Sequence, residues 1–264
     1  MDWSRIKTIF IISFLLLDIY LAYQLISTRD EANYEFMKEV SLEEKLKNDD
    51  ITYSGLPQEL VKERYVSVRQ KVFKPEDLSP NQVQKLGSSE GAIITGYLEN
   101  PVELTGKFNS DEFIAAVRND IKHADQYRFW EKNDDEGTIT YYQQYEGKTM
   151  YHNLNAKLTF FINEQNEVDT FEQTFLEVIE ELSDEQEVLA PLSAIETLYK
   201  RGFLKPRTEI TKVELGYSTL VQLTASQVLA PTWRIVVNGE ENLFVHAFEG
   251  QVIQLDSSEN QTTE

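Results

Sequence analysis

A long apolar run near the start of the chain constrains its fold more than any other feature. The run extends from Thr8 to Ile26. As an α-helix it would rise about 28 Å, close to the thickness of the hydrocarbon core of a membrane. A cleaved signal peptide has a shorter apolar region that ends in small residues at a cleavage site. The sequence after Ile26 lacks that pattern, so we predict that residues 8–26 form one uncleaved transmembrane helix.

The charges that flank this run predict its orientation. Arg5 and Lys7 lie on its N-terminal side, whereas Asp30 and Glu31 follow it. Because positively charged flanks stay on the cytoplasmic side of a membrane, residues 1–7 are expected to form a short cytoplasmic tail. The rest of the chain is then extracytoplasmic, which predicts a single-pass protein of the cell membrane.

Asp18 is the one acidic residue within the apolar run. An ionised carboxylate at this depth costs on the order of 3 kcal/mol, which the surrounding Ile, Leu and Phe residues offset, so insertion is still expected. Acids within membranes commonly serve function. One interpretation is therefore that Asp18, with Ser13, Tyr20 and Ala22, contacts the transmembrane helix of a partner. The other is a protonated or snorkelling carboxyl group with no partner.

The composition of the whole chain limits what the protein can be. With 41% hydrophobic residues, 14 Phe and 13 Tyr, it has the composition of a folded protein rather than of an acidic disordered tail. The formal net charge of −20 would repel phosphate backbones, so nucleic acid is not an expected partner. The absence of cysteine excludes disulfides and thiolate chemistry, and in an exported chain it favours a Gram-positive extracytoplasmic space.

Residues 27–50 are highly charged and are expected to form a juxtamembrane stalk. Ser41 and Glu44 have the spacing of a capping box, in which two side chains satisfy free amides at a helix start. A thin apolar stripe at helical spacing favours a helix, and a flexible tether is the alternative. The stripe consists of Tyr34, Met37, Val40 and Leu46.

A first lobe of helix and antiparallel sheet is predicted over residues 51–182. Asn109 and Glu112 are placed to satisfy the free amides of a helix start reciprocally. The apolar face of that helix would be Phe113, Ile114, Val117 and Ile121. Segments rich in β-branched and aromatic residues predict the strands, which are Val61–Phe73, Ala92–Leu98, Thr138–Tyr145, Ala156–Ile162 and Val168–Ile179.

A second lobe with the same order of elements is predicted over residues 183–256. Pro191 and Gly202 mark the start and the stop of its helix. Asn238-Gly239 and Glu249-Gly250 are hairpin signals, the first of type I′ composition. The fold class predicted for the ectodomain is therefore α+β, with two related lobes and a flexible tail at 257–264. The expected strands are Thr208–Tyr217, Thr232–Val237, Leu243–Phe248 and Gln251–Leu255.

The sequence contains no recognised motif for catalysis or metal binding. Its three histidines form no local ligand pair; they are His123, expected in a helix, His152 and His246. The acidic residues 134–136 are typical of a solvated turn and lack the ligand spacing of a calcium loop. No phosphate-binding loop, nucleophile elbow or dinucleotide turn is present. We therefore expect no catalytic residue, no metal and no cofactor, in a protein that is not an enzyme.

Two segments of the sequence resemble the YycI (WalI) family of Gram-positive regulators. The first is Met1–Ile11, MDWSRIKTIFI, which leads into the apolar run. The second comprises residues 230–239, APTWRIVVNG, and 244–252, FVHAFEGQV. These look like the closing hairpin of a PepSY-like module. The likeness covers essentially the whole chain in length and layout.

The resemblance implies a single-span regulator without catalytic residues. Family members share their extracytoplasmic fold with the C-terminal domains of a sister protein, YycH, and both associate with the sensor histidine kinase YycG (WalK). Through that kinase they adjust the response regulator YycF (WalR), which controls cell-wall metabolism. The partners implied here are a YycG/WalK-like kinase and a YycH-like single-span protein, and because members either restrain or support the kinase, the sign of regulation stays open.

The short cytoplasmic tail has no room for a signalling domain, so a regulator with this layout has to act laterally, through its membrane helix and its ectodomain. One alternative function is an extracytoplasmic binding module for a wall-derived peptide or glycan. Such a module would use exposed aromatic side chains, for which the candidates are Tyr141, Tyr142, Tyr145 and Tyr151. The other interpretation is that these rings belong to the core, as aromatic residues that alternate along strands more often do. An extracytoplasmic hydrolase is a further alternative, which no recognised motif supports.

Overall fold

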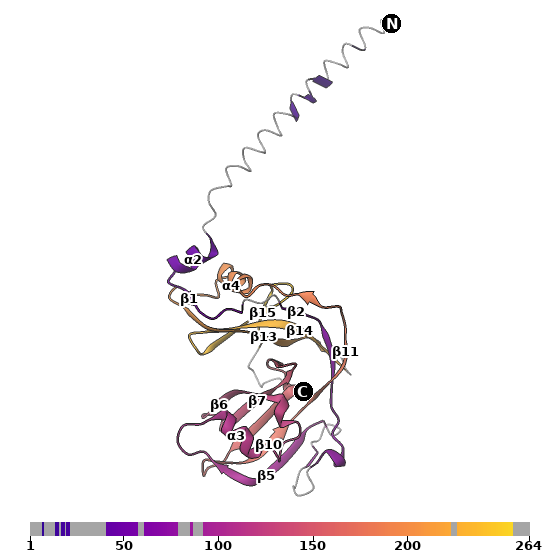
Figure 1. Cartoon of the computed structure of the whole chain (residues 1–264), viewed down its shortest axis with the longest axis vertical. Helices are drawn as coiled ribbons and strands as arrows, with labels where there is room; N and C mark the ends of the chain where they lie inside the picture. Colours follow the sequence, from indigo (N-terminus) through magenta and orange to yellow (C-terminus); the bar gives the residue numbers. More distant parts are fainter. Residues whose placement is uncertain are drawn as a thin grey trace, which may run out of the picture. The chain divides into compact units, whose positions relative to one another are not determined.

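The structure is a computed structural model in which the chain divides into two compact units, residues 1–48 and 49–264 (Figure 1). The residues that the structure describes are 7, 14–15, 17–18, 20–21, 41–57, 61–78, 85–86, 92–222 and 226–255.

The first unit contains the segment predicted to cross the membrane. Residues 14–15, 17–18 and 20–21 are helical. No helix among the described residues is long and apolar enough to span a membrane. The transmembrane helix predicted over 8–26 and the tail predicted over 1–7 lie largely outside the described residues, so both stay predictions.

Helix α2 (Leu42–Asn48) lies in the last part of the predicted stalk. Its start has the expected cap, because the Ser41 hydroxyl oxygen accepts a hydrogen bond of 3.2 Å from the Glu44 amide. Glu43 and Glu44 also lie in the first turn, where the helix dipole favours negative charge. Residues 27–40 lie outside the described part of the chain, so the stalk as a whole stays a prediction.

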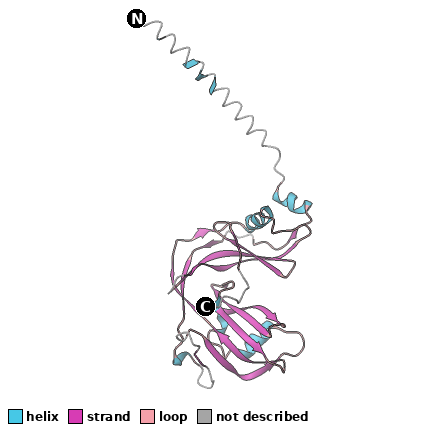
Figure 2. Cartoon of the chain, turned by 180° about the vertical axis from the view of Figure 1, so that it is seen from behind, coloured by secondary structure: helices cyan, strands magenta, loops and turns pink. Residues whose placement is uncertain are grey.

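The second unit is mostly β-sheet with few helices (Figure 2), which supports the expected α+β class in this coarser form. Its α-helices in the described chain are α3 (Ser110–Val117) and α4 (Pro191–Lys200). A small sheet pairs β2 (Lys62–Glu63) with β12 (Gln186–Glu187). Short 3₁₀ turns are η1 (Pro75–Asp77), η2 (Ala124–Gln126) and η3 (Leu154–Ala156).

The first large sheet is antiparallel, with the strand order β4-β5-β10-β9-β7-β6 and β8 paired to β7. Because side chains alternate along a strand, Ile139 and Tyr141 of β7 share one face with Leu158 and Phe160 of β9, their cross-strand partners. Helix α3 adds Phe113 to the same core. The strands are β4 (Lys85–Leu86), β5 (Ile94–Glu103), β6 (Tyr127–Asn133), β7 (Thr138–Tyr145), β8 (Lys148–Thr149), β9 (Lys157–Ile162) and β10 (Glu167–Gln173).

The second large sheet is built around β14, which has neighbours on both sides. One side carries β13, which in turn pairs with β1 in parallel. The other side carries β3 at Gln227–Leu229 and β15 at Thr232–Val237, while β11 pairs with β3 and β16 with β15. The strands are β1 (Thr52–Tyr53), β3 (Val66–Gln70), β11 (Leu176–Glu181), β13 (Glu209–Gln222), β14 (Gln227–Val237), β15 (Glu241–His246) and β16 (Val252–Ile253).

The two large sheets are interleaved in the sequence. Strands β3 and β11 belong to the second sheet, yet β4 to β10 of the first sheet lie between them in the chain. The chain therefore passes from one sheet to the other twice, before β4 and between β10 and β11. The lobe ranges 51–182 and 183–256 stay predictions about domains, and the strand pairing adds that each sheet draws on distant segments.

Both predicted helices of the ectodomain are present with their end signals. The Asn109 side-chain oxygen accepts from the amides of Asp111 and Glu112 at 3.0 and 3.4 Å. At the end of α4, Gly202 has φ +77°, and its amide donates to the Tyr199 carbonyl while Phe203 donates to Leu198. These two bonds are the Schellman pattern, which glycine in the left-handed region allows.

The local structure differs from the expectations at four places. Val61–Phe73, expected as one strand, forms β2 and β3 in different sheets. Val168–Ile179, expected as one strand, forms β10 and β11 in different sheets, because the Thr174 hydroxyl bonds to the Leu154 and Lys157 carbonyls and holds the chain at the crossing. Strand β6 was not expected. His123 has φ +55° and lies in the left-handed region ahead of η2, not in a helix.

The sheets are joined by a shared core and by a polar clamp. The core combines Met150 and Ala156 with Val66, Val68 and Leu229 of the second sheet. In the clamp, the Arg234 guanidinium lies 4.2 Å from the centre of the Trp130 ring. Arg234 also pairs with Glu214 at 2.6 Å, and Arg128 of β6 reaches the same carboxylate at 3.3 Å.

Candidate binding groove between the sheets

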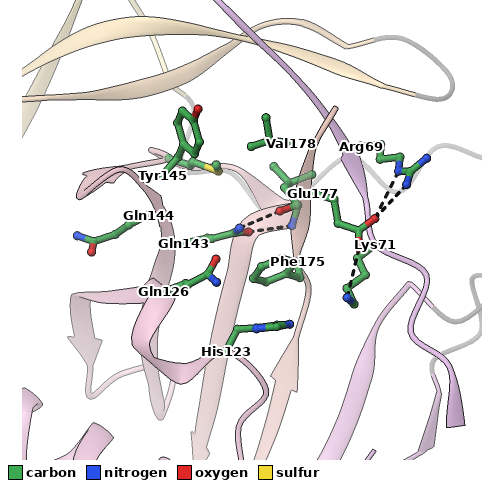
Figure 3. A pocket seen from close by; sticks show the side chains of 12 residues that line it. Arg69, Lys71, His123, Gln126, Gln143, Gln144, Tyr145, Phe175, Glu177 and Val178 are labelled. Carbon is green, nitrogen blue, oxygen red and sulfur yellow. Dashed lines mark hydrogen bonds and ion pairs between the residues drawn. The ribbon is translucent and has the colours of Figure 1, made fainter. Parts of the chain in front are cut away.

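A groove with a volume of about 470 Å³ lies where the two sheets meet (Figure 3). One wall comes from the end of β7 and from η2 of the first sheet, and the other from β11 and β3 of the second. Its lining mixes polar and apolar side chains, which are Arg69, Lys71, His123, Gln126, Gln143, Gln144, Tyr145, Met150, Phe175, Leu176, Glu177 and Val178.

The turn after β7 places the first wall. Glu146 and Gly147 both have positive φ, +50° and +76°, as a type I′ hairpin turn requires, and they connect β7 to β8. This turn holds Tyr145 at the groove, where its hydroxyl donates to the Glu181 carboxylate at 3.3 Å. Burial, aided by the charges of Glu146 and Glu181, raises the pKa of Tyr145, so the phenol stays a hydrogen-bond donor.

Gln143 connects the two walls. Its amide nitrogen donates to the Leu176 carbonyl at 2.8 Å, and its amide oxygen accepts from the Leu176 amide at 2.8 Å. Both residues are buried, so these bonds satisfy backbone groups that would otherwise lie unpaired away from water. The pair fixes the position of β11 relative to β7.

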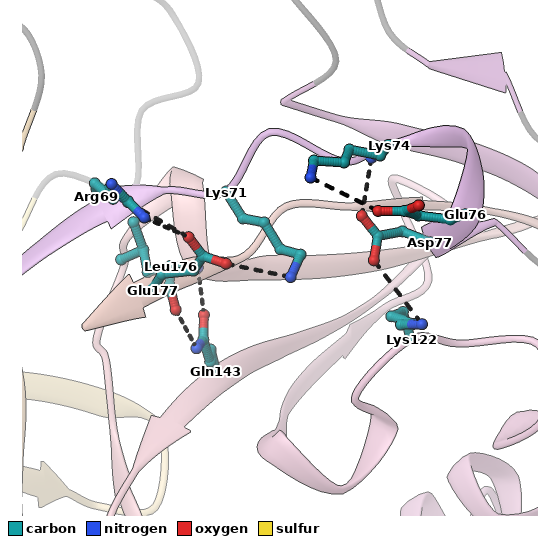
Figure 4. A network of polar contacts seen from close by, with 9 residues as sticks. All are labelled: Arg69, Lys71, Lys74, Glu76, Asp77, Lys122, Gln143, Leu176 and Glu177. Carbon is teal, nitrogen blue, oxygen red and sulfur yellow. Dashed lines mark hydrogen bonds and ion pairs between the residues drawn. The ribbon is translucent and has the colours of Figure 1, made fainter. Parts of the chain in front are cut away.

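Three charged side chains meet at the side of the groove formed by β3. The Glu177 carboxylate lies 3.3 Å from Arg69 and 3.2 Å from Lys71 (Figure 4), and Lys71 also lies over the Phe175 ring at 5.8 Å. Glu177 and Arg69 are cross-strand partners, so their ion pair also supports the pairing of β3 with β11. Glu177 offsets one of the two cations, so these three side chains carry a net charge of +1.

A second hollow, of about 520 Å³, continues from Arg69, Lys71 and Glu177 towards η1. Asp77 lies at its far end and accepts a hydrogen bond of 2.8 Å from the Lys74 amide. That hydrogen bond, with the charges of Lys71 and Lys122, lowers the pKa of Asp77. The carboxylate therefore stays ionised and stabilises the start of η1.

His123 forms part of the groove floor beside Phe175. The centres of the two rings lie 4.7 Å apart. Burial, with the charges of Lys71 and Lys122, lowers the pKa of His123, so its neutral form predominates at pH 7. The side chain offers a hydrogen-bond donor and an acceptor instead of a positive charge.

The groove has the chemistry of a binding site. It presents amides, a phenol, a neutral imidazole and apolar surface, which are groups of the kind that line ligand pockets. Among the residues that the structure describes, no group of three or more His, Asp or Glu side chains could hold a metal ion. His152 and His246 lie outside the groove lining, so the three histidines are not brought together.

The aromatic residues proposed to bind a wall fragment do not form an exposed surface. Tyr141, Tyr142 and Tyr151 are buried, and Tyr145 alone of the four lines the groove. The core interpretation is confirmed for the three buried rings, because the sheets pack on them. Tyr151, for example, lies against Phe244 with 5.3 Å between ring centres.

The residues predicted to contact a partner within the membrane belong to the first unit. Asp18 and Tyr20 are helical and exposed. Ser13 and Ala22 lie outside the described residues. Their proposed contact therefore stays a prediction.

Fold and groove together define a β-rich protein with a groove of mixed polar and apolar lining between two sheets. The family model described as "YycI protein" matches residues 31–248. The chain therefore belongs to the YycI family. This membership supports a role in two-component regulation, whereas particular partners remain a matter for proposal.

Three solved bacterial structures are similar to parts of this chain. An uncharacterized protein from Eubacterium rectale ATCC 33656 has 11% identity and a TM-score of 0.47, with 79% of this chain and 92% of that chain covered. The Bacillus megaterium YpeB C-terminal domain has 8% identity and a TM-score of 0.38, covering 70% and 86%. YycH from Bacillus subtilis has 13% identity and a TM-score of 0.38, covering 74% and 54%. No curated protein matches the chain.

Proposed function

We propose that this protein is a non-enzymatic, membrane-anchored regulator of a two-component system that controls cell-wall metabolism. It associates with a sensor histidine kinase of the YycG (WalK) type and with a YycH-like single-span protein. The observation that carries the proposal is the match of the YycI family model over residues 31–248. The predicted anchor and its orientation add that the C-terminal unit is extracytoplasmic.

The predicted membrane helix is one of the two surfaces through which the regulator acts. In this proposal the helix packs beside the spans of the kinase, and a polar contact from Asp18 favours one of two kinase states. Ser13, Tyr20 and Ala22 complete the contact. A coupling free energy of about 1–3 kcal/mol changes a signalling equilibrium severalfold or more, so a few contacts are sufficient.

A membrane pull-down tests the proposal. The full-length protein is compared with a version that lacks residues 1–29 and is exported by another route. We expect a histidine kinase and a second single-span protein to co-purify with the full-length form alone. Recovery of no kinase with either form would contradict the proposal.

Two variants of the full-length protein locate the contact. Replacement of the predicted span by an unrelated apolar segment of equal length should abolish regulation while the anchor is retained. Asp18→Leu should weaken recovery of the kinase, and unchanged recovery and signalling would exclude Asp18 as a partner contact.

The groove favours a second candidate function, the binding of a wall-derived peptide or glycan. Its amides, the Tyr145 hydroxyl and neutral His123 are groups that such ligands bind. Titration of the protein with purified wall peptides and glycan fragments would show saturable binding. Gln144→Ala and His123→Asn should weaken that binding, and a lack of saturation with every fragment would exclude this function.

A further inference from the structure

We infer that the outer edge of β11 binds an extended, lysine- or arginine-rich segment of a partner protein as an additional strand of the second sheet. The inference rests on the proposed function in assigning the ligand to a partner protein, and it deepens that function by naming a surface and a partner chemistry.

Strand β11 has a free side in the described chain. Its strand partner there is β3 on one side. The Lys71 amide donates to the Phe175 carbonyl just ahead of β11. This bond shows that the backbone groups of Phe175 face β3. Residues that bond the neighbouring strand alternate with residues whose backbone groups face outward. Leu176 and Val178 therefore direct their N–H and C=O groups towards the free side.

The Gln143 side chain already pairs with the first outward position of this edge in the manner of a strand. Its amide donates to the Leu176 carbonyl and accepts from the Leu176 N–H, each at 2.8 Å. A residue of an adjacent antiparallel strand would make the same two bonds. The outward groups of Val178 have no hydrogen-bond partner among the described residues. The edge is thus capped at its first position and open at the next.

Apolar side chains are exposed along the open part of the edge. Val178 is 41% exposed, Ile179 48% and Leu182 45%. Val178 also faces the groove that Tyr145 lines from the other wall (Figure 3). Natural sheets usually protect such an edge, and strand addition at an unprotected one is a common mode of peptide recognition.

Charge selects the kind of segment that binds. Residues 177–187 contain six acidic and no basic residues. Three of these acids are already paired with Arg64, Arg69 or Lys71. A second copy of this chain would bring the same acids face to face, in a protein of net charge −20, so a basic segment of another protein is favoured. The acids without an ion-pair partner in the described chain are Glu180, Asp184 and Glu187.

A defined peptide and the full chain test the inference. The probe is an acetylated and amidated hexapeptide in which lysine and valine alternate, labelled for fluorescence anisotropy. We expect saturable binding and slower hydrogen exchange at the Val178 amide. A peptide of the same sequence with alternate backbone nitrogens methylated, and one with glutamate for lysine, should each bind at least about tenfold more weakly, since strand addition needs main-chain donors and charge complementarity.

Variants of the edge separate strand addition from charge alone. Val178→Pro removes an outward N–H and no bond to β3, so far-UV circular dichroism should be unchanged while affinity falls about tenfold. Glu180→Lys should weaken binding severalfold. Its matched control is Glu172→Lys on β10, an exposed position in a strand paired on both sides, which should leave binding unchanged.

Several results would overturn the inference. One is a lack of saturable binding up to about 1 mM peptide. Others are equal affinity for the methylated and unmethylated peptides, and equal loss of affinity in Glu172→Lys and Glu180→Lys. Dimerisation of the chain that Val178→Pro abolishes would also overturn it. The methylated peptide decides the point if the proline variant does not fold. Peptide binding without kinase co-purification would refute the proposed function and leave this inference standing. Kinase co-purification without peptide binding would refute this inference alone.

Discussion

His152 should make the folded protein lose stability in mild acid. Its ring packs between the sheets, with centres 4.9 Å from Trp130 and 5.6 Å from Phe244. Burial, with the charges of Arg234 and Lys157, lowers its pKa from 6.5 to about 4. Above pH 6.5 the imidazole is neutral in both the folded and the unfolded chain, so its contribution to the free energy of unfolding does not depend on pH.

Between pH 6.5 and 4 the unfolded chain binds the proton and the folded protein does not, so stability falls as the pH falls. A pKa change of this size corresponds to about 3 kcal/mol, since each pKa unit is worth about 1.4 kcal/mol. That is a large share of the roughly 5–15 kcal/mol by which proteins are stable. Below pH 4 both states are protonated and no further loss from this group is expected.

His152→Asn isolates the effect. Asparagine does not titrate and tolerates the positive φ of +49° at this position. Guanidinium denaturation of wild type and variant, followed by far-UV circular dichroism between pH 4 and 8, gives the free energy of unfolding. Wild type should lose about 3 kcal/mol more than the variant between pH 6.5 and 4. Equal pH dependence in the two proteins would refute the reasoning.

Three further predictions concern stability, measured by denaturant unfolding. Gly216→Ala should lower the free energy of unfolding by about 1–3 kcal/mol, because the added Cβ would overlap the Tyr151 ring and lie 2.5 Å from the Thr149 carbonyl oxygen. Tyr151→Leu in the same chain should recover part of that loss, and unchanged stability of Gly216→Ala would contradict the close packing. Arg234→Lys should cost about 1–2 kcal/mol, because it keeps the charge but loses stacking on Trp130; unchanged stability would show that the stacking contributes nothing. Asn109→Ala should cost about 1 kcal/mol and Asn109→Asp almost nothing, and an equal loss in both variants would exclude the capping explanation.

Local signals in the sequence predicted the elements whose ends they encode. Asn109 starts α3, Gly202 ends α4, and Asn238-Gly239 has φ +53° and +79° in the turn between β14 and β15. Each signal depends on the conformational preference of one or two residues. Such preferences do not depend on tertiary contacts, so the ends of these elements could be predicted from the sequence.

The division between the sheets could not be predicted in this way. Val168–Ile179 has β-forming residues throughout, and its break depends on hydrogen bonds of Thr174 with Leu154 and Lys157, residues that lie far from it in the sequence. Strand β6 was missed because charged residues interrupt it and its outer edge is unpaired in the described chain. Both errors arise where tertiary packing overrides local preference.

The groove had no sequence signal at all. Its walls bring together Arg69, His123, Gln143 and Glu177, which come from four separate segments. No spacing rule relates such positions. Gln143 lies in a polar pair at the end of a strand, and only the position of Leu176 in the folded protein gives its amide a role.

The two crossings of the chain link the groove to the packing of the sheets. One wall belongs to the first sheet and the other to the second, while Gln143, Arg234 and Tyr151 hold the sheets together. A segment bound along β11 would contact both walls, so its binding free energy depends on how the sheets are packed. By linkage, the same segment then stabilises that packing by an equal amount. Loosening the junction with Gly216→Ala should therefore weaken binding at β11, although Gly216 does not itself line the groove.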